Sequence, residues 1–283
     1  MAAQNRPLLI ADREPARRAE RADAARSLQY ARSHARLFPG AGTAWMPLAE
    51  GCAVFTGTGS PLSKAVGMGA GGDIGPKDID ALESFYQDHG MPAALDLAPF
   101  AGPSLLELLA VRGYTISYFL NILALPLAPS EHNSSPDSSS PSTDGYHIRR
   151  VSAEDEHTWI ETVAAGFAGD TKPGREDREI FTTQFHAENA HCFIAEMDGE
   201  PVGGGLVAIA DGTALLGAAS VLPGHRGHGI HRALVRERLA HAAGLGCDLG
   251  VTGATPGSVS QRNLQRYGFQ ILYTRPSLRR SIR

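Results

Sequence analysis

One segment of the chain combines glycines with basic side chains in a pattern that could hold phosphate groups. Residues 219–234 have the sequence ASVLPGHRGHGIHRAL. We expect a strand to end near Pro223 and a helix to begin near Gly229. A helix start leaves about four backbone N–H groups without partners and carries a partial positive charge. Glycines let a phosphate approach such a backbone closely. The segment therefore predicts a pyrophosphate cradle, with Arg226 and Arg232 adding positive charge. A plain glycine-rich loop without a ligand remains the alternative.

Two other phosphate-binding loops fit this segment less well. A Walker loop requires Gly-Lys-Ser/Thr after its glycines, and no such sequence follows. A dinucleotide-binding loop requires a third spaced glycine and an acidic residue after the next strand. The run Ile230-His231-Arg232 breaks the first condition, and Asp248 stands at the start of the next expected strand. The nucleotide-dependent dehydrogenases are therefore disfavoured.

The elements around this segment predict an α/β (α+β) fold with a mixed central sheet flanked by helices. Asp198-Gly199 and Asp211-Gly212 are typical of tight hairpin turns. Strands joined first by hairpins and then by crossover helices imply a mixed sheet. In this half of the chain we expect strands at 146–150, 190–196, 200–210, 213–222, 248–254 and 269–275, and helices at 152–167, 180–189, 229–244 and 258–267.

The chain divides into two predicted domains. Residues 129–144 contain seven serines and three prolines and no large apolar side chain, so they predict a flexible linker. This leaves domains at 1–128 and 145–283, each long enough for its own core. In the first domain we expect helices at 15–37, 76–89 and 103–111, and strands at 51–59, 94–97 and 114–127.

Composition excludes several classes of function. The 283 residues carry a formal net charge of −4, which argues against a nucleic-acid-binding surface. No apolar run reaches the roughly 20 residues of a membrane helix. The three cysteines, Cys52, Cys192 and Cys247, lie far apart and predict neither a disulfide framework nor a metal site. Because the start of the chain lacks the pattern of a secretory signal, we expect a cytoplasmic protein.

Two motifs resemble those of a known family. Val221-x-Pro223-x-x-Arg226-Gly227-x-Gly229-Ile230, followed by Ala233-Leu234, is similar to the acetyl-CoA-binding motif of the GNAT (GCN5-related) N-acetyltransferases, whose core pattern is Arg/Gln-x-x-Gly-x-Gly/Ala. His231 departs from the third fixed place of that pattern. Further along, residues 260–269, SQRNLQRYGF, resemble the second signature of the family, a short helix that ends in Gly-Phe. The resemblance covers about residues 146–274.

The resemblance implies acetyl-CoA as cosubstrate and places its contacts. The backbone of Ala219, Ser220 and Val221 would pair with the pantetheine arm. The Val221 amide would polarise the thioester carbonyl, as an oxyanion-hole donor does. Ser260 and Asn263 stand where the family often contacts the cosubstrate. The residues expected to hold the pyrophosphate are Arg226, Gly227, His228, Gly229, Ile230, His231 and Arg232.

The groups that move protons are less clear. Direct attack by an amine requires a base for the amine proton and an acid for the leaving thiolate. Many members of the family place a tyrosine four residues before the glycine of Gly-Phe, and this chain has Leu264 there. Tyr267 is the weak candidate for a relocated acid. The candidate bases are Glu196, Asp198 and His225.

The N-terminal half resembles a degenerate copy of the same family, as in tandem arrangements. Residues 103–114 look like a second-signature helix that ends in Gly-Tyr, yet no Arg-x-x-Gly-x-Gly precedes them. The run Gly67-x-Gly69-x-Gly71-Gly72 is a weak phosphate-loop signal because Asp73 follows it. We therefore expect a non-catalytic domain, with an unrelated α/β domain as the alternative.

Together these observations predict an acetyl-CoA-dependent N-acyltransferase that moves an acetyl group to an amine by direct attack on the thioester. The acceptor would be a small molecule or a peptide, and the protein a monomer or homodimer, with no nucleic-acid or membrane partner. The alternative is a catalytically weak module of the same fold that binds an acyl-CoA or a metabolite. Leu264 and His231 are the residues that support this alternative.

Overall fold

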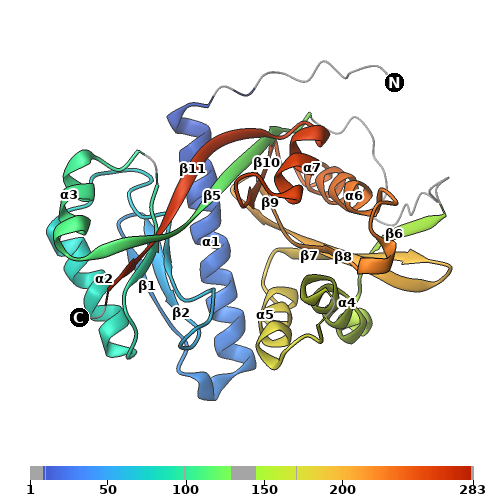
Figure 1. The fold of residues 1–283 in the computed structure, drawn as a ribbon, viewed down its shortest axis with the longest axis horizontal. Helices are drawn as coiled ribbons and strands as arrows, with labels where there is room; N and C mark the ends of the chain where they lie inside the picture. Colours follow the sequence, from blue (N-terminus) through green and yellow to red (C-terminus); the bar gives the residue numbers. More distant parts are fainter. Residues whose placement is uncertain (1–8, 10, 99, 129–144, 170, 282–283) are drawn as a thin grey trace. The chain divides into compact units, whose positions relative to one another are not determined.

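The computed structural model describes residues 9, 11–98, 100–128, 145–169 and 171–281, so the predicted linker at 129–144 lies outside the described residues. The chain forms two compact units (Figure 1). Unit 1 contains residues 1–125 and 253–283, and unit 2 contains residues 126–252. Each unit is described by itself below.

Unit 2 is built on a mixed sheet in the order β6-β7-β8-β9-β10. Neighbouring strands run antiparallel except β9 and β10, which run parallel. The strands are β6 (Tyr146–Arg150), β7 (Ala190–Met197), β8 (Glu200–Ala210), β9 (Thr213–Val221) and β10 (Leu249–Ala254), whose last two residues fall in unit 1. The helices are η2 (Ala153–Asp155), α4 (Glu156–Ala168), α5 (Arg175–Phe185), η3 (Pro223–His225) and α6 (Ile230–Gly244).

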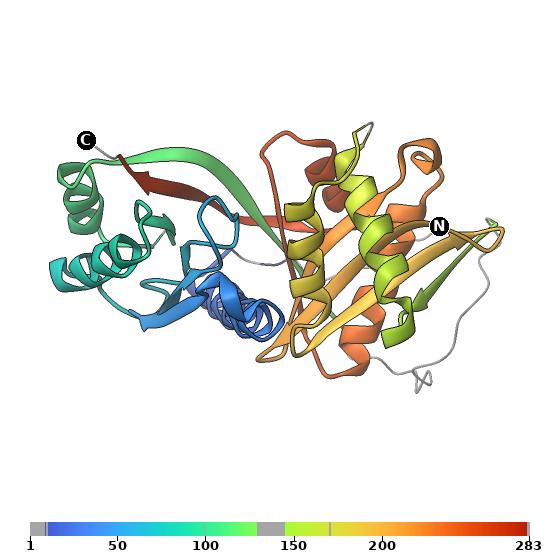
Figure 2. The same cartoon turned by 90° about the horizontal axis from the view of Figure 1, so that it is seen from below.

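Helices cover both faces of this sheet. Figure 2 shows α4 and α5 on one face and α6 on the other. Trp159 of α4 is fully buried, and its indole N–H donates to the Phe193 carbonyl at 3.0 Å. The predicted hairpins are confirmed, because Asp198, Gly199, Asp211 and Gly212 all have the positive φ that such turns require.

The strands of unit 1 follow the order β1-β2-β3-β4-β11-β5, with both parallel and antiparallel neighbours. Strand β11, from the C-terminal end of the chain, lies between β4 and β5 and runs antiparallel to both. The strands are β1 (Ala44–Leu48), β2 (Gly51–Phe55), β3 (Ala65–Val66), β4 (Ala94–Asp96), β5 (Tyr114–Pro126) and β11 (Gln270–Arg280). The helices are α1 (Arg13–Leu37), η1 (Pro39–Ala41), α2 (Pro76–Asp88), α3 (Pro103–Val111) and α7 (Val259–Tyr267).

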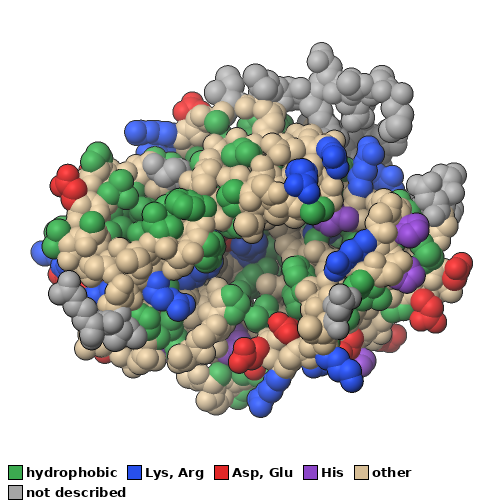
Figure 3. Space-filling view, viewed as in Figure 1, with side chains coloured by type: hydrophobic (Ala, Val, Ile, Leu, Met, Phe, Trp, Pro, Cys, Tyr) green, Lys and Arg blue, Asp and Glu red, His purple; other side chains and the backbone are tan. Residues whose placement is uncertain are grey.

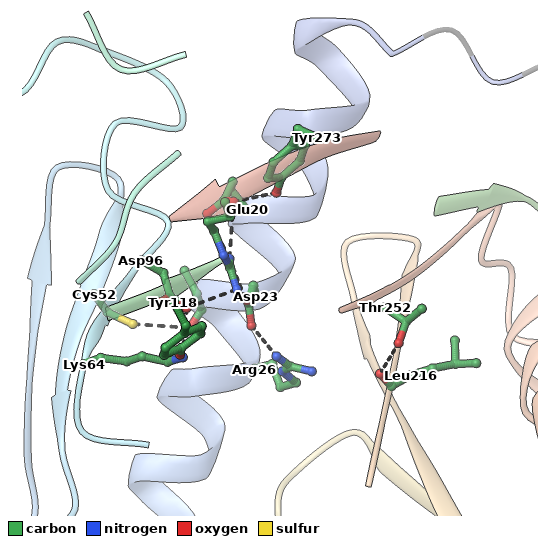
Figure 4. Close-up of polar contacts among 12 residues, drawn as sticks. Glu20, Asp23, Arg26, Cys52, Lys64, Asp96, Tyr118, Leu216, Thr252 and Tyr273 are labelled. Atoms are coloured by element: carbon green, nitrogen blue, oxygen red, sulfur yellow. Dashed lines mark hydrogen bonds and ion pairs between the residues drawn. The ribbon is translucent and has the colours of Figure 1, made fainter. Parts of the chain in front are cut away.

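A buried cluster of charges joins α1, β4 and β11 within unit 1 (Figure 4). The Arg275 guanidinium lies 2.8 Å from the Asp23 carboxylate, 3.3 Å from Glu20 and 3.1 Å from Asp96. Lys64 adds a second cation at 2.9 Å from Asp96. Burial raises the pKa of Glu20 although Arg275 opposes it. Burial also acts to raise the pKa of Asp23, but the guanidinium groups nearby outweigh it and hold that pKa below its ordinary value. The cluster fixes the C-terminal strand in the sheet of unit 1.

The predicted fold class is confirmed, and so are most predicted elements. Helix α5 begins and ends earlier than the predicted 180–189, and the sequence did not predict β1 or β3. Strand β11 runs five residues beyond the predicted end at 275. The predicted domain limits of 1–128 and 145–283 stay a prediction, while the compact units group 253–283 with 1–125. Among the residues with described structure, none of the helices combines the length and apolar character needed to cross a membrane.

Candidate functional site

The site begins where β9 and β10 part. Their parallel pairing covers Thr213–Leu215 opposite Leu249–Val251. One residue later, the Thr252 hydroxyl donates to the Leu216 carbonyl at 3.2 Å, as Figure 4 shows. Beyond this contact, no pairing between β10 and the last five residues of β9, 217–221, is found in the described chain. These residues therefore present an open edge on the side that β10 has left.

A β-bulge decides which backbone groups face this open edge. Gly204 pairs with Ser220, and Leu206 pairs with Gly217, so two residues of β9, Ala218 and Ala219, lie opposite one residue of β8. Ala218 has a φ of +47°, which marks the bulge. After the bulge, the Leu222 N–H donates to the Val202 carbonyl of β8 at 2.9 Å. Because N–H groups alternate along a strand, the N–H groups of Val221 and Ala219 point to the open edge.

The loop after β9 is open at its glycines. Gly227 has a φ of +87° and Gly229 a φ of +79°, both in the left-handed region that favours glycine. A Cβ built at Gly227 would meet no atom within 4 Å. At Gly229 it would meet only the Tyr146 hydroxyl, at 3.6 Å. Tyr146, a buried residue of β6, is a neighbour of the cradle that the sequence did not predict.

Helix α6 starts from this loop with its N–H groups uncapped. The first intrahelical bond runs from the Ala233 N–H to the Gly229 carbonyl at 3.1 Å, so the N–H groups of the preceding turn lie ahead of it. In the part of the chain that the structure describes, no side chain caps this end, and the sequence has no acidic residue from 212 to 236. Figure 3 shows purple (His) and blue (Lys, Arg) side chains over this part of unit 2. The arrangement favours an anion at the start of α6.

The Arg226 side chain bonds two backbone carbonyls beside the cradle. Its Nε donates to the Val221 carbonyl at 3.1 Å, and its Nη2 donates to the Gly166 carbonyl of α4 at 3.0 Å. The guanidinium thus ties the loop to the end of β9 and to α4. Contact of Arg226 with a pyrophosphate stays a prediction, and Arg232 is exposed in the first turn of α6.

The His231 ring adds no positive charge to the cradle at neutral pH. Its ring is half-buried, and burial lowers its pKa to about 4, with the positive charge of Arg238 acting in the same direction. The ring is therefore neutral at pH 7. Ile230 is 1% exposed and packs into the core, so only its backbone is available to a ligand. His228 and His225 lie in the loop itself, the first exposed and the second half-buried.

The residues of β9 also offer backbone rather than side chains. The Ser220 hydroxyl donates to the Val163 carbonyl of α4 at 2.9 Å, which holds this side chain against the helix. A Cβ at Gly166 would collide with the Ser220 side chain, so glycine at 166 allows this close approach of α4. These contacts fix the strand end whose edge carries the N–H groups of Ala219 and Val221.

The predicted base Glu196 is already paired. The Arg149 guanidinium donates to Glu196 Oε1 through Nε at 3.0 Å and through Nη2 at 2.8 Å. Arg149 also binds the Asp155 carboxylate, whose pKa lies below its ordinary value because of these bonds. Asp198 is exposed in the β7–β8 turn. Among the described residues, no group of three His, Cys, Asp or Glu side chains could hold a metal ion.

The second motif forms α7, which lies in unit 1. The Ser258 hydroxyl caps this helix by accepting from the Gln261 N–H at 3.1 Å, and Gly268 ends it with a φ of +119°. Leu264, at the place of the family's tyrosine, is 4% exposed and packs into the core. Ser260 and Asn263 are exposed, and Tyr267 is half-buried. Because the cradle lies in unit 2, contacts of these residues with the cosubstrate stay a prediction.

A family model describes the segment that carries both motifs. Residues 146–269 match the model of the acetyltransferase (GNAT) family. These residues form a GNAT domain. The match contains the whole cradle and the whole second motif, so the resemblance that the motifs indicated is confirmed. No curated protein sequence matches the chain significantly.

Solved structures extend the likeness to the N-terminal half. A GCN5-related N-acetyltransferase from Kribbella flavida has a TM-score of 0.59 at 19% identity, covering 89% of this chain and 96% of its own. One from Sphaerobacter thermophilus has a TM-score of 0.53 at 21% identity, covering 72% and 67%. A tandem GNAT protein from the clavulanic acid biosynthesis pathway has a TM-score of 0.53 at 18% identity, covering 81% and 77%. At these identities the likeness shows the fold alone, and it confirms a GNAT-like N-terminal half.

Proposed function

We propose that the protein is an acetyl-CoA-dependent N-acetyltransferase that moves an acetyl group to an amine by direct attack on the thioester. One observation carries the proposal. The open edge of β9, with outward N–H groups at Ala219 and Val221, runs directly into the uncapped start of α6. A row of strand donors followed by an anion site fits a ligand with an amide-containing arm and a pyrophosphate.

The residues present fit acetyl-CoA in three places. The backbone of Ala219 and Val221 would bond the pantetheine amides as an added strand does. The open glycines 227 and 229 and the first turn of α6 would take the pyrophosphate. The positive charge of Arg232 would lie beside it. Acetyl-CoA itself supplies the activated acetyl thioester.

The Val221 N–H is the proposed oxyanion donor. When an amine attacks the thioester carbonyl, negative charge develops on the carbonyl oxygen, and a preplaced N–H donor stabilises it. Loss of one such donor typically lowers kcat by about 10²–10³-fold. Arg226 would hold this end of β9 by bonding the Val221 carbonyl at 3.1 Å.

The proton groups and the acceptor belong to the same proposal. Glu196 would act as base only if Arg149 released it, because the pair is held at 2.8 Å. Tyr267 stays the proposed acid. We propose a small-molecule or peptide amine as acceptor, without a nucleic-acid or membrane partner, and a monomer or homodimer. We place the reaction in the cytoplasm, with which three buried thiols, Cys52, Cys192 and Cys247, are compatible.

The experiment has two parts. CoA binding is measured by titration calorimetry, and thiol release from acetyl-CoA is measured with a panel of small amines, amino acids and peptide N-termini. We expect saturable CoA binding and thiol release that depends on at least one amine. Binding without release for any amine would indicate a non-catalytic CoA-binding module instead. Absence of binding at millimolar CoA would overturn the proposal.

A further inference from the structure

We propose that Arg238 is a positioning residue for acetyl transfer, because its buried guanidinium holds the bulge that turns the Val221 N–H to the open edge of β9. Its role in acetyl transfer rests on the proposed function, whereas its role in shaping β9 does not. Arg238 lies on the inner face of α6 and is only 1% exposed.

The guanidinium of Arg238 bonds three backbone carbonyls. Its Nε donates to the Leu234 carbonyl, one turn back on α6, at 2.9 Å. Its Nη1 donates to Leu206 of β8 at 2.9 Å and to Gly217 of β9 at 3.1 Å. Leu206 and Gly217 are the last regular pair before the bulge. One nitrogen thus bridges the two strands at the point where their register changes.

A charge in this position is costly and has no carboxylate partner among the described residues. Burial lowers the pKa of Arg238 to about 10, so the side chain stays charged at neutral pH. Taking a cation out of water costs several kcal/mol unless fixed partners replace the water. A leucine or methionine would fill an inner helix position without this cost. The arginine is explained by the carbonyls of Leu206 and Gly217, which it joins.

The bulge determines which way the Val221 N–H points. Before the bulge, the Leu216 carbonyl faces β10, where it accepts from Thr252, so Gly217 faces β8. In a regular strand, every second residue after Gly217, including Val221, would also face β8. The extra residue reverses this order, and Leu222 rather than Val221 bonds β8. Without the bulge, the proposed oxyanion donor would be turned into the sheet.

Gly205 provides independent support from the opposite strand. It stands across from the bulge, and a Cβ built on it would lie 2.9 Å from Arg238 Nη1 and 3.0 Å from Cζ. Ordinary side-chain contacts are longer, so the guanidinium occupies space that only glycine leaves. Two strands and one helix are therefore fitted to this single side chain.

The first test compares Arg238→Met with Arg236→Met as a control, because Arg236 is exposed on the same helix and bonds Glu237 beside it. We expect Arg238→Met to lower kcat by about 100-fold, the usual effect of losing one oxyanion donor. The Kd for CoA should rise by much less than kcat falls, because the pyrophosphate site at the start of α6 is intact and only the strand N–H groups that face the pantetheine arm are turned away. Arg238→Lys should restore part of kcat. A folded Arg238→Met protein with the kcat of the wild type would overturn the proposal.

The second test uses Gly205→Ala, which displaces the guanidinium without removing it. We expect the same loss of kcat, and no further loss when Gly205→Ala and Arg238→Met are combined, because both remove one contact. If the two losses of kcat multiply in the double variant, Gly205 and Arg238 do not act through the same contact, and the proposal is contradicted.

The third test does not depend on activity. Residue-specific amide exchange in the unliganded protein should be fast at Val221 and slow at Ser220, whose N–H faces β8. In Arg238→Met the order should reverse as the bulge relaxes. If the wild type fails to acetylate any amine, this exchange pattern still decides whether Arg238 holds the bulge. An unchanged pattern in Arg238→Met would overturn that role.

Discussion

Two glycine-rich loops lead from a strand into a helix, one before α2 in unit 1 and one before α6 in unit 2, and they treat backbone N–H groups in opposite ways. At the start of α2, the Gly75 N–H donates to the Asp78 carboxylate at 2.8 Å. Asp73 stands in the same loop and adds negative charge. At the start of α6, no described side chain caps the helix, and the sequence has no acidic residue from 212 to 236. The first helix carries its own carboxylates at its N-terminal end, and the second does not.

The glycines of the two loops differ in the same sense. In the α2 loop, a Cβ at Gly71 would overlap the Glu50 carboxylate, and one at Gly69 would lie 2.9 Å from Ile74. Ala70, between them, and Met68, just before them, are both fully buried. In the α6 loop, Gly227 faces open space. Glycine allows close packing in one loop and close approach of a ligand in the other, so glycine content alone does not identify a phosphate site.

The largest expected effect concerns the buried charge cluster of unit 1. Arg275→Met would leave Glu20, Asp23 and Asp96 buried without their shared cation, and we expect a loss of about 3–5 kcal/mol in the free energy of unfolding. Urea denaturation measures this loss. Arg279→Met, on the exposed side of the same strand, is the control and should change stability by less than about 0.5 kcal/mol. Equal losses of stability in both variants would show that the buried ion pairs of Arg275 do not stabilise unit 1.

The next effect makes the α6 loop resemble the α2 loop. Gly229→Glu adds a carboxylate beside the N–H groups that would bind pyrophosphate, at a positive φ that a side chain tolerates poorly. We expect the Kd for CoA to rise by at least about 100-fold, or about 2.7 kcal/mol. Calorimetry checks this. Gly246→Glu, at a φ of +87° beyond the other end of α6, carries the same strain and should keep the Kd of the wild type. Similar Kd values for Gly229→Glu and Gly246→Glu would show that the pyrophosphate of CoA does not bind at the start of α6.

The sequence predicted the α6 loop well because its signals are local. A strand end, spaced glycines and a helix start lie within about a dozen residues, and the Asp-Gly hairpins that precede them have equally local rules. The strand β1 was missed because its turn into β2 uses Ala49 and Glu50 at positive φ instead of glycine or asparagine. The position of β11 beside β4 joins segments far apart in sequence, which no local pattern reveals.

The roles of the arginines were harder to predict than their positions. Arg226 was expected to contact pyrophosphate, yet its guanidinium bonds the carbonyls of Val221 and Gly166. Arg238 received no role from the sequence, although it follows Leu234 by four residues and so belongs to the apolar face of α6. A charged residue on an apolar face was the available signal. Its partners, the carbonyls of Leu206 and Gly217, become neighbours only in the folded sheet.

A moderate effect tests whether the α6 loop needs its anchor. Arg226→Met removes two charge-assisted bonds to carbonyls, and we expect the KM for acetyl-CoA to rise by about tenfold, near 1.4 kcal/mol. Initial rates over a range of acetyl-CoA concentrations give this value. Arg226→Lys should recover little, because one ammonium cannot reach both carbonyls as the planar guanidinium does. An unchanged KM in the methionine variant would remove the anchoring role.

A pH effect tests whether the partly buried ring of His241 on α6 is kept neutral. Burial lowers the pKa of His241 to about 4, with His191 and Arg150 acting in the same direction. The unfolded chain binds a proton near pH 6.5, so stability is full above that pH and falls as the pH drops towards 4. His241→Phe should make this fall shallower, by about 1–2 kcal/mol at pH 4.5. Denaturant unfolding at several pH values gives the free energy of unfolding of both proteins. The same pH dependence in the wild type and in His241→Phe would contradict the prediction.

The smallest effect concerns the α2 loop. Asp78→Ala removes the carboxylate that accepts from Gly75, and we expect a loss of about 1 kcal/mol in stability. The Kd for CoA should not change, because Gly69 and Gly71 are packed against Ile74 and Glu50, and Asp73 still gives this loop a negative charge. Thermal unfolding and calorimetry on the same sample test both statements. Tighter CoA binding by Asp78→Ala would contradict this, because it would mean that the Asp78 carboxylate alone prevents CoA from binding at the α2 loop.

The central claim is that the α6 loop, and not the α2 loop, holds acetyl-CoA. Residue-specific amide exchange with and without CoA tests it most directly. We predict that CoA slows exchange at Val221 and at 227–232, and leaves exchange at 67–75 unchanged. Slower exchange at 67–75 with no change at 227–232 would contradict the account.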